Sequence, residues 1–275
     1  MRTAQAAATY VLGGPSGTLA PNSGSWAWDG SYVAGYRGAI TTAANFGPSG
    51  TVKTTISATT LTSITAGTLS SLNGFIAPWW YNSDSASYNQ TVVNFFLGGG
   101  ALFLLDDSSA QTGIAALLGI ATQDASDGSV SNGSAPLFNG PFGIATNVTQ
   151  TAEHGYLIAG NITSHGGFVC STNASGQITA ACFNAGAYAA GAGPMVITTD
   201  VDMITTSPAG TATYSPLNAN GQFALNATSF LLTGTSNPTP PTTPAAPALS
   251  DYGLVGLAGL LVASATIMIG RKSVG

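Results

Sequence analysis

The chain has 275 residues, enough for one large domain or two small ones. Only 5% of the residues are charged, and between residues 3 and 270 the basic side chains are Arg37 and Lys53. Several Lys or Arg are needed to bind a phosphate backbone, so the composition predicts no nucleic-acid partner. General disorder is also excluded, because 44% of the residues are hydrophobic and the net charge is only −5.

The first eight residues, MRTAQAAA, contain one basic residue and an alanine-rich stretch that is typical of a cleavage site. A complete signal peptide has an apolar run of about 7–15 residues between these two features, and the sequence has none there. We interpret residues 1–8 as the remnant of a signal peptide. Residues 9–235 are the expected globular domain.

Within this domain, apolar strand patterns alternate with segments whose apolar residues are spaced near the helical repeat. This alternation predicts an α/β fold, with a mainly parallel sheet covered by helices. The expected strands are residues 9–14, 51–57, 75–80, 101–109 and 193–204, and the expected helices are residues 31–47, 85–100, 111–119 and 223–234.

Three aromatic residues, Trp79, Trp80 and Tyr81, follow the strand that begins at residue 75. At the carboxyl edge of a parallel sheet their rings could stack on sugar rings. Packing in the core or along the sheet edge is the alternative, since aromatic side chains bury large areas. Surface glycans are therefore a candidate partner.

Four aspartates are expected at the same edge of the sheet. Asp106 and Asp107 follow the strand ALFLL, and Asp200 and Asp202 lie in GPMVITTDVDMI. Ligands of open α/β sheets bind outside the carboxyl ends of the strands, and carboxylate oxygens suit Ca²⁺. The four side chains are therefore a candidate calcium site, and no other cofactor is expected. Capping of helix or loop amides, or a paired-carboxylate hydrolase, are the alternatives.

The two cysteines, Cys170 and Cys182, lie in FVCSTNASGQITAACF. Two short strand patterns joined by Asn-Ala-Ser-Gly predict a β-hairpin, which we expect to be an insertion into the domain. A disulfide between the cysteines is favoured over two buried thiols, because other features of the chain point outside the cytoplasm.

The order GFIAPWWYN, VVNFFLGGGALFLLDD and GPMVITTDVDMI, within residues 74–206, resembles the class I glutamine amidotransferase-like fold in its non-enzymatic extracellular branches. The resemblance implies a flavodoxin-like sheet with helices on both faces. In the catalytic families a nucleophilic cysteine follows the equivalent of ALFLL. This sequence has Asp106, Asp107 and Ser108 there, so we expect no amidotransferase activity and predict that the domain is not an enzyme.

The end of the chain has three parts. Residues 236–248 form a Pro/Thr-rich segment that is expected to act as an extended spacer. Residues 252–270 carry no charge, and as a helix they would span about 28 Å, close to the thickness of a bilayer core. Arg271 and Lys272 follow and would stay in the cytoplasm. The pattern predicts a transmembrane helix, and a buried core helix is the alternative.

The segment APALSDYG before this span resembles the IPTL-CTERM sorting signal, a relative of the PEP-CTERM signals that exosortase-type proteases read. The chain has Ala at 246 and 248, where that pattern has Ile and Thr. Residues 249–275 are thus the expected sorting signal. The residues that carry the resemblance are Pro247, Leu249, Ser250 and Gly253, with Arg271 and Lys272 as the basic end.

Together these features predict a bacterial protein that is exported, held in the inner membrane transiently, processed by an exosortase-type protease and delivered to the cell surface or extracellular matrix. We expect its role to be non-enzymatic. A carbohydrate-binding surface module that uses Trp79–Tyr81 is the first alternative. A carboxylate-dependent hydrolase is the second, and for the tail a permanent membrane anchor remains open.

Overall fold

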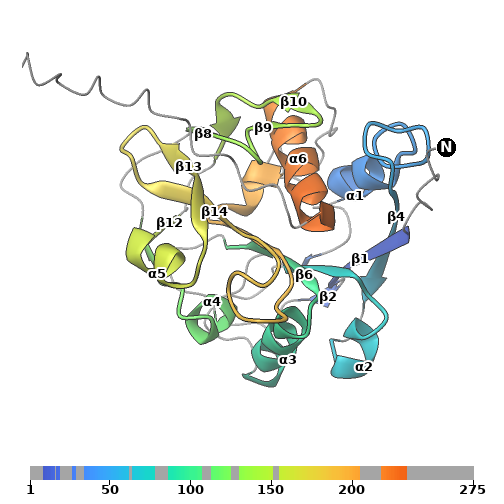
Figure 1. Ribbon diagram of the computed structural model, residues 1–275, viewed down its shortest axis with the longest axis horizontal. Helices are drawn as coiled ribbons and strands as arrows, with labels where there is room; N and C mark the ends of the chain where they lie inside the picture. The colour runs from blue at the N-terminus through green and yellow to red at the C-terminus, as the bar shows by residue number, and fades with distance from the viewer. Residues whose placement is uncertain are drawn as a thin grey trace, which may run out of the picture. The chain divides into compact units, whose positions relative to one another are not determined.

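A mixed β-sheet runs through the domain (Figure 1). The structure is a computed structural model, and it describes residues 9–15, 17–18, 27–28, 34–61, 64–77, 86–106, 113–124, 130–150, 155–204 and 218–233. The expected signal-peptide remnant, spacer, transmembrane helix and sorting signal lie outside these residues. In the described part of the chain, no helix has both the length and the apolar character needed to cross a membrane.

Five strands form what we call the parallel half of the sheet, in the order β4-β1-β5-β6-β15. Every neighbouring pair among them is parallel. The central strands are apolar throughout and are buried on both faces: in β6, Leu102 and Leu104 pack into one hydrophobic cluster, and Phe103 and Leu105 into another. Their bounds are β1 Thr9–Pro15, β4 Thr55–Leu61, β5 Gly74–Ala77, β6 Ala101–Leu105 and β15 Met195–Thr198.

The other six strands form the antiparallel half. β14 pairs with β15, β13 and β12, and the sheet continues through β8 to β11 and through β12 to β7. All of these pairs are antiparallel. The bounds are β7 Thr122–Asp124, β8 Val130–Gly133, β11 Val148–Thr149, β12 Gly155–Leu157, β13 Phe168–Asn173 and β14 Ile178–Phe183.

Helices α1 and α6 lie on one side of the sheet, and α2, α3, α4 and α5 lie on the other (Figure 1). Two small two-stranded sheets, β2–β3 and β9–β10, lie outside the main one. The remaining bounds are α1 Ala34–Thr41, α2 Ala66–Leu69, α3 Ala86–Leu97, α4 Gly113–Leu117, α5 Ala159–Ser164, the 3₁₀ helix η1 Val201–Ile204, α6 Ala219–Thr233, β2 Gly17–Thr18, β3 Ala27–Trp28, β9 Asn139–Gly140 and β10 Gly143–Ile144.

The expected mainly parallel, flavodoxin-like sheet is wrong, because the sheet is mixed. A parallel connection needs a crossover of a dozen or more residues, whereas β13 and β14 are joined by the four residues 174–177. The expectation that this hairpin is an insertion is also wrong. β14 lies in the sheet interior, and five of its six residues are buried. The hairpin is therefore part of the core.

Buried polar side chains of helix α6 bond to the backbone of the segment between β8 and β11 and to β11 itself. Asn226 accepts from the backbone N–H of Phe142 (2.9 Å) and donates to the carbonyls of Leu137 and Gly143 (both 3.1 Å). Near the start of the helix, Asn220 is bonded in the same way to the backbone of Thr149. These asparagines satisfy loop groups that would otherwise be buried without hydrogen bonds.

Candidate functional site

The carboxyl edge of the parallel half holds two of the predicted carboxylates. Asp106 directly follows β6, and Asp200 follows β15, the next strand in the sheet. The backbone N–H of Asp106 donates to the carbonyl of Thr198 (2.9 Å), so the two strand ends remain paired to this point. Both aspartates are buried, with 0% and 1% of their surfaces exposed. The prediction that they gather at one sheet edge is consistent with these positions.

The rest of the predicted edge is described only in part. Trp79, Trp80, Tyr81 and Asp107 lie outside the described residues, and of Asp202 only the backbone, in η1, is described. Among the described side chains, no group of three or more His, Cys, Asp or Glu is placed to hold a metal ion. The calcium site therefore stays a prediction.

Behind this edge lies a chain of buried hydroxyl groups that the sequence reasoning did not identify. Thr179 Oγ1 lies 2.7 Å from Ser131 Oγ and 2.7 Å from Ser171 Oγ, and Ser131 Oγ lies 2.8 Å from Gln150 Oε1. The chain connects β8, β13 and β14. The carbonyl of Thr179 also accepts from the N–H of Thr199, which links it to the residue before Asp200.

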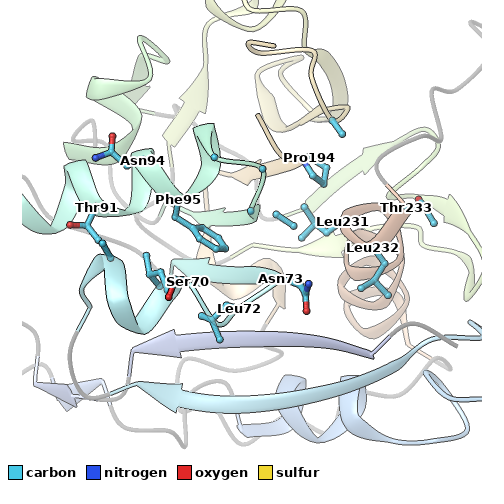
Figure 2. A pocket seen from close by; sticks show the side chains of 17 residues that line it. Ser70, Leu72, Asn73, Thr91, Asn94, Phe95, Pro194, Leu231, Leu232 and Thr233 are labelled. Carbon is cyan, nitrogen blue, oxygen red and sulfur yellow. The ribbon is translucent and has the colours of Figure 1, made fainter. Parts of the chain in front are cut away.

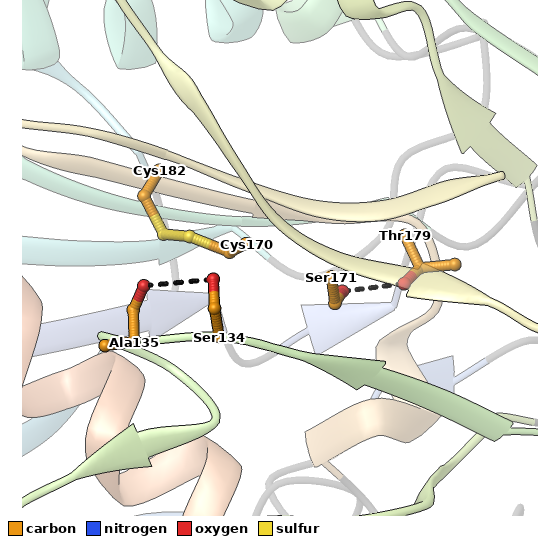
Figure 3. Close-up of a disulfide and its surroundings, with 6 residues drawn as sticks. All are labelled: Ser134, Ala135, Cys170, Ser171, Thr179 and Cys182. Carbon is orange, nitrogen blue, oxygen red and sulfur yellow. Dashed lines mark hydrogen bonds between the residues drawn. A yellow bond between two sulfur atoms is a disulfide. The ribbon is translucent and has the colours of Figure 1, made fainter. Parts of the chain in front are cut away.

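The disulfide between Cys170 and Cys182 is confirmed, and it crosses from β13 to β14 (Figure 3). The two Cα atoms are 6.2 Å apart, and both side chains are buried in the cluster that α6 covers. Ser171 and Thr179 of the hydroxyl chain lie in the same hairpin. A covalent bond and a polar network therefore stabilise this part of the sheet together.

The described histidine, His165, follows α5. Its ring stacks on Tyr188, with the ring centroids 4.8 Å apart. The Tyr188 hydroxyl donates to the carbonyl of Leu118 (2.7 Å), and burial raises the pKa of this hydroxyl above its ordinary value. His165 and Tyr188 thus form an aromatic contact beside α4 and α5. His154 lies outside the described residues.

A pocket of about 630 Å³ lies at the opposite edge of the sheet, where three parallel strands begin. Asn73 precedes β5, Gly100 precedes β6 and Pro194 precedes β15, and all three residues line it. Residues of α2, α3 and the end of α6 complete its walls (Figure 2). Its volume falls within the range of about 300–1,000 Å³ that is usual for small-ligand sites.

A run of three glycines, residues 98–100, shapes one wall of this pocket. Helix α3 ends at Leu97, and Gly99 has φ +101°, a left-handed conformation that favours glycine. A Cβ on Gly100 would collide with the ring of Phe95, so the glycine allows that ring to lie against the backbone. The three glycines lie at the end of the expected helix 85–100, and the pocket that they help to form was not predicted from the sequence.

No family model matches the chain, and no curated protein matches it either. Among solved structures, the mmIFT52 N-terminal domain aligns with 84% of this chain and 100% of its own, with a TM-score of 0.52 and 11% identity. The exo-beta-1,4-mannosidase Op5Man5 from Opitutaceae bacterium strain TAV5 aligns with 82% of this chain and 36% of its own, with a TM-score of 0.48 and 11% identity. At such identity, the first likeness shows a related fold alone.

Proposed function

We propose that this chain is a bacterial surface protein, exported and then processed at a C-terminal sorting signal, whose globular domain is not an enzyme. The observation that carries the proposal is the buried disulfide between Cys170 and Cys182. Disulfides persist in oxidising compartments outside the cytoplasm and are rare within it. The bond joins two strands of the sheet itself, so its formation is coupled to the folding of the domain.

The residue at the end of β6 supports a non-catalytic role. In the amidotransferase-like resemblance a nucleophilic cysteine would follow this strand, and the chain has Asp106, Asp107 and Ser108 there. Asp106 has 0% of its surface exposed. Burial also weighs against the hydrolase alternative, because general acid–base residues have to come within hydrogen-bonding reach of a substrate. We interpret Asp106 and Asp200 as structural groups of the sheet edge.

The proposed route to the surface rests on the tail. The motif residues Pro247, Leu249, Ser250 and Gly253 precede an uncharged span, and Arg271 and Lys272 follow it. In this proposal the span holds the protein in the inner membrane until an exosortase-type protease acts, and the proline-rich spacer keeps the domain clear of the bilayer.

Three measurements on cells that express the full chain test this proposal. Thiol labelling after denaturation should find Cys170 and Cys182 oxidised, and fractionation should place the protein at the surface or in the medium. Mass spectrometry of the mature form should find a C-terminus before Tyr252. A cytoplasmic protein with two free thiols would contradict export, and surface fractions that retain Arg271 would contradict cleavage.

A further inference from the structure

We propose that the pocket at the amino ends of β5, β6 and β15 is a binding site for an uncharged saccharide of about two sugar units. Seventeen residues of the described chain line it, and none of them carries a formal charge. This inference builds on the proposed function, because a surface protein meets polysaccharides where it acts. The site is distinct from Trp79–Tyr81, which follow β5 at its other end.

The hydroxyl groups of the pocket can accept hydrogen bonds from a ligand, because each already donates its own proton to a backbone carbonyl. Ser70 Oγ donates to the carbonyl of Gly67 (2.8 Å), and Thr91 Oγ1 donates to the carbonyl of Ser87 (2.7 Å). At the end of α6, Thr233 Oγ1 lies 3.3 Å from the carbonyl of Ser229. Each hydroxyl thus uses its single proton within its own helix or turn, and its lone pairs remain available to a ligand. A ligand rich in O–H donors satisfies this arrangement.

Apolar groups alternate with these hydroxyls around the pocket. The half-buried ring of Phe95 projects from α3 toward the middle of the lining side chains, with Leu72 and Leu232 nearby (Figure 2). Phe95 is held edge-to-face against Phe75, with the centroids 6.5 Å apart, and by the backbone at Gly100. A fixed aromatic face beside hydroxyl acceptors matches a sugar ring, which has C–H groups on its faces and O–H groups at its rim.

The absence of charge from the described lining selects against ionic ligands. A carboxylate or ammonium group that enters the pocket gives up hydration, and no residue of opposite sign lines the pocket to replace it. A neutral hydroxyl loses much less hydration free energy when it enters the pocket. We therefore expect the site to bind neutral disaccharides and to reject uronic acids and amino sugars of the same size.

Binding is measured on the purified full chain, in a detergent without a sugar headgroup, because a glycoside detergent would occupy the site. The probes are cellobiose, maltose and N,N′-diacetylchitobiose, with digalacturonic acid as the charged control. We expect at least one neutral probe to bind with a dissociation constant below about 5 mM and the charged control to bind at least about tenfold more weakly. Amide NMR shifts should appear at Gly98–Gly100 and in α3, and Asp106 and Asp200 should be unaffected.

Two variants with matched controls locate the site. Phe95→Ala removes the aromatic face and should weaken binding by about tenfold or more. Leu97→Ala, on the same helix but 39% exposed and outside the pocket lining, should bind like the parent. Thr91→Val keeps the shape, removes one acceptor and should cost about three- to tenfold in affinity. Thr163→Val removes the same kind of helical hydroxyl from α5 and should leave the affinity unchanged.

A hexasaccharide of the best probe distinguishes a free sugar from a polymer as the natural ligand. Equal or tighter binding of the hexasaccharide would indicate a polysaccharide chain, and exclusion would indicate a free disaccharide. The inference is overturned if no neutral probe binds, if the charged control binds as well, or if the shifts appear away from the pocket. Each of these results leaves export and processing untouched, since those are measured separately in cells.

Discussion

The two halves of the sheet are stabilised by different forces. In the parallel half, β5 and β6 bury apolar side chains on both faces, and the largest of them, Phe75 and Phe103, are fully inaccessible to solvent. In the antiparallel half the buried side chains include Thr179 and Ser131, and a disulfide joins β13 to β14. The first half depends on apolar area, and in the second a disulfide and a buried polar network add to the apolar contacts.

The difference matters because the two kinds of interaction respond differently to change. Burial of apolar surface is non-directional, and its loss scales with the volume removed. A buried hydrogen-bond network is directional, and removal of one member leaves its partners unsatisfied. Substitutions in the parallel half should therefore lower the free energy of unfolding in proportion to size. Those in the antiparallel half should do so in proportion to the bonds lost.

The largest effect is expected from Phe103→Ala in the parallel half. Phe103 is fully buried in the middle of β6 and contacts Tyr36 edge-to-face, with the centroids 6.3 Å apart. The cavity should lower the free energy of unfolding by about 3–5 kcal/mol, measured by urea denaturation. Leu97→Ala, on the exposed side of α3, is the control and should change it by less than about 0.5 kcal/mol. Equal effects of the two would contradict the apolar account.

The parallel half was also the more predictable one from sequence. Continuous apolar runs predicted β5, β6 and β15, and the apolar spacing predicted α3 and α6 to within a few residues. The expected strand 193–204 was too long, because β15 ends at Thr198 and Val201–Ile204 form η1. The antiparallel strands are short, and polar residues interrupt their patterns: β8 is Val-Ser-Asn-Gly, and β11 has two residues. Ser131 is buried because Thr179 and Gln150 bond to it, and such long-range pairing has no local pattern.

Removal of the disulfide tests the antiparallel half. The paired substitution Cys170→Ala with Cys182→Ala opens a loop with a sequence separation of 12 residues. The entropy gained by the unfolded chain should cost about 3 kcal/mol in the free energy of unfolding. Hydrogen exchange should then rise first in β13 and β14, while β5 and β6 remain protected. A uniform rise across both halves would show that they unfold as one unit.

The next effect is expected at Asn226, which joins α6 to the β9–β10 segment. Asn226→Ala leaves the N–H of Phe142 and the carbonyls of Leu137 and Gly143 without their partner. We expect a loss of about 2–3 kcal/mol in the free energy of unfolding. Asn226→Asp keeps the acceptor for Phe142 but places a buried carboxylate against the carbonyls of Leu137 and Gly143. At neutral pH it should therefore lower the free energy of unfolding at least as much as Asn226→Ala.

The two edges of the parallel half differ in how far the sequence reveals them. Asp106 follows β6 directly and Asp200 lies two residues after β15, so their position near the carboxyl edge could be predicted from the apolar strands. The pocket at the other edge is assembled from α2 and α3, which are consecutive helices, and from α6, which lies far from them in the chain. Its one local signal is the glycine run 98–100. Helix α2 was not among the expected helices, although Thr65 and Thr68 form a capping box at its start.

A smaller effect is expected from Thr179→Val, which keeps the shape of the side chain. The substitution leaves the hydroxyls of Ser131 and Ser171 without their shared partner. The free energy of unfolding should fall by about 1–2 kcal/mol. Thr59→Val, at an exposed position of β4, is the control and should be neutral or slightly stabilising. If both variants were neutral, the hydroxyl chain would contribute nothing to the antiparallel half.

The smallest effect at neutral pH concerns a polar pair beside the parallel half, where Tyr36 packs against Phe103 of β6. The Tyr36 hydroxyl lies 2.7 Å from Thr228 Oγ1, between α1 and α6, and both side chains are fully buried. Tyr36→Phe should cost about 1 kcal/mol in the free energy of unfolding at pH 7. Because the partner there is a hydroxyl that also donates to the carbonyl of Ala224, the cost should stay modest.

At alkaline pH the free energy of unfolding of Tyr36→Phe should rise relative to that of the parent. Burial raises the pKa of Tyr36, so the folded protein keeps this proton while the unfolded chain loses it above about pH 10. The stability that Tyr36 contributes is therefore complete below pH 10 and falls by up to about 1.4 kcal/mol per pH unit above it. The pKa of Tyr188 is also raised, but its contribution is the same in the variant and the parent and cancels in the difference. Urea denaturation between pH 7 and 11 should show the curves converge and cross, whereas parallel curves would mean that water reaches Tyr36 in the folded domain.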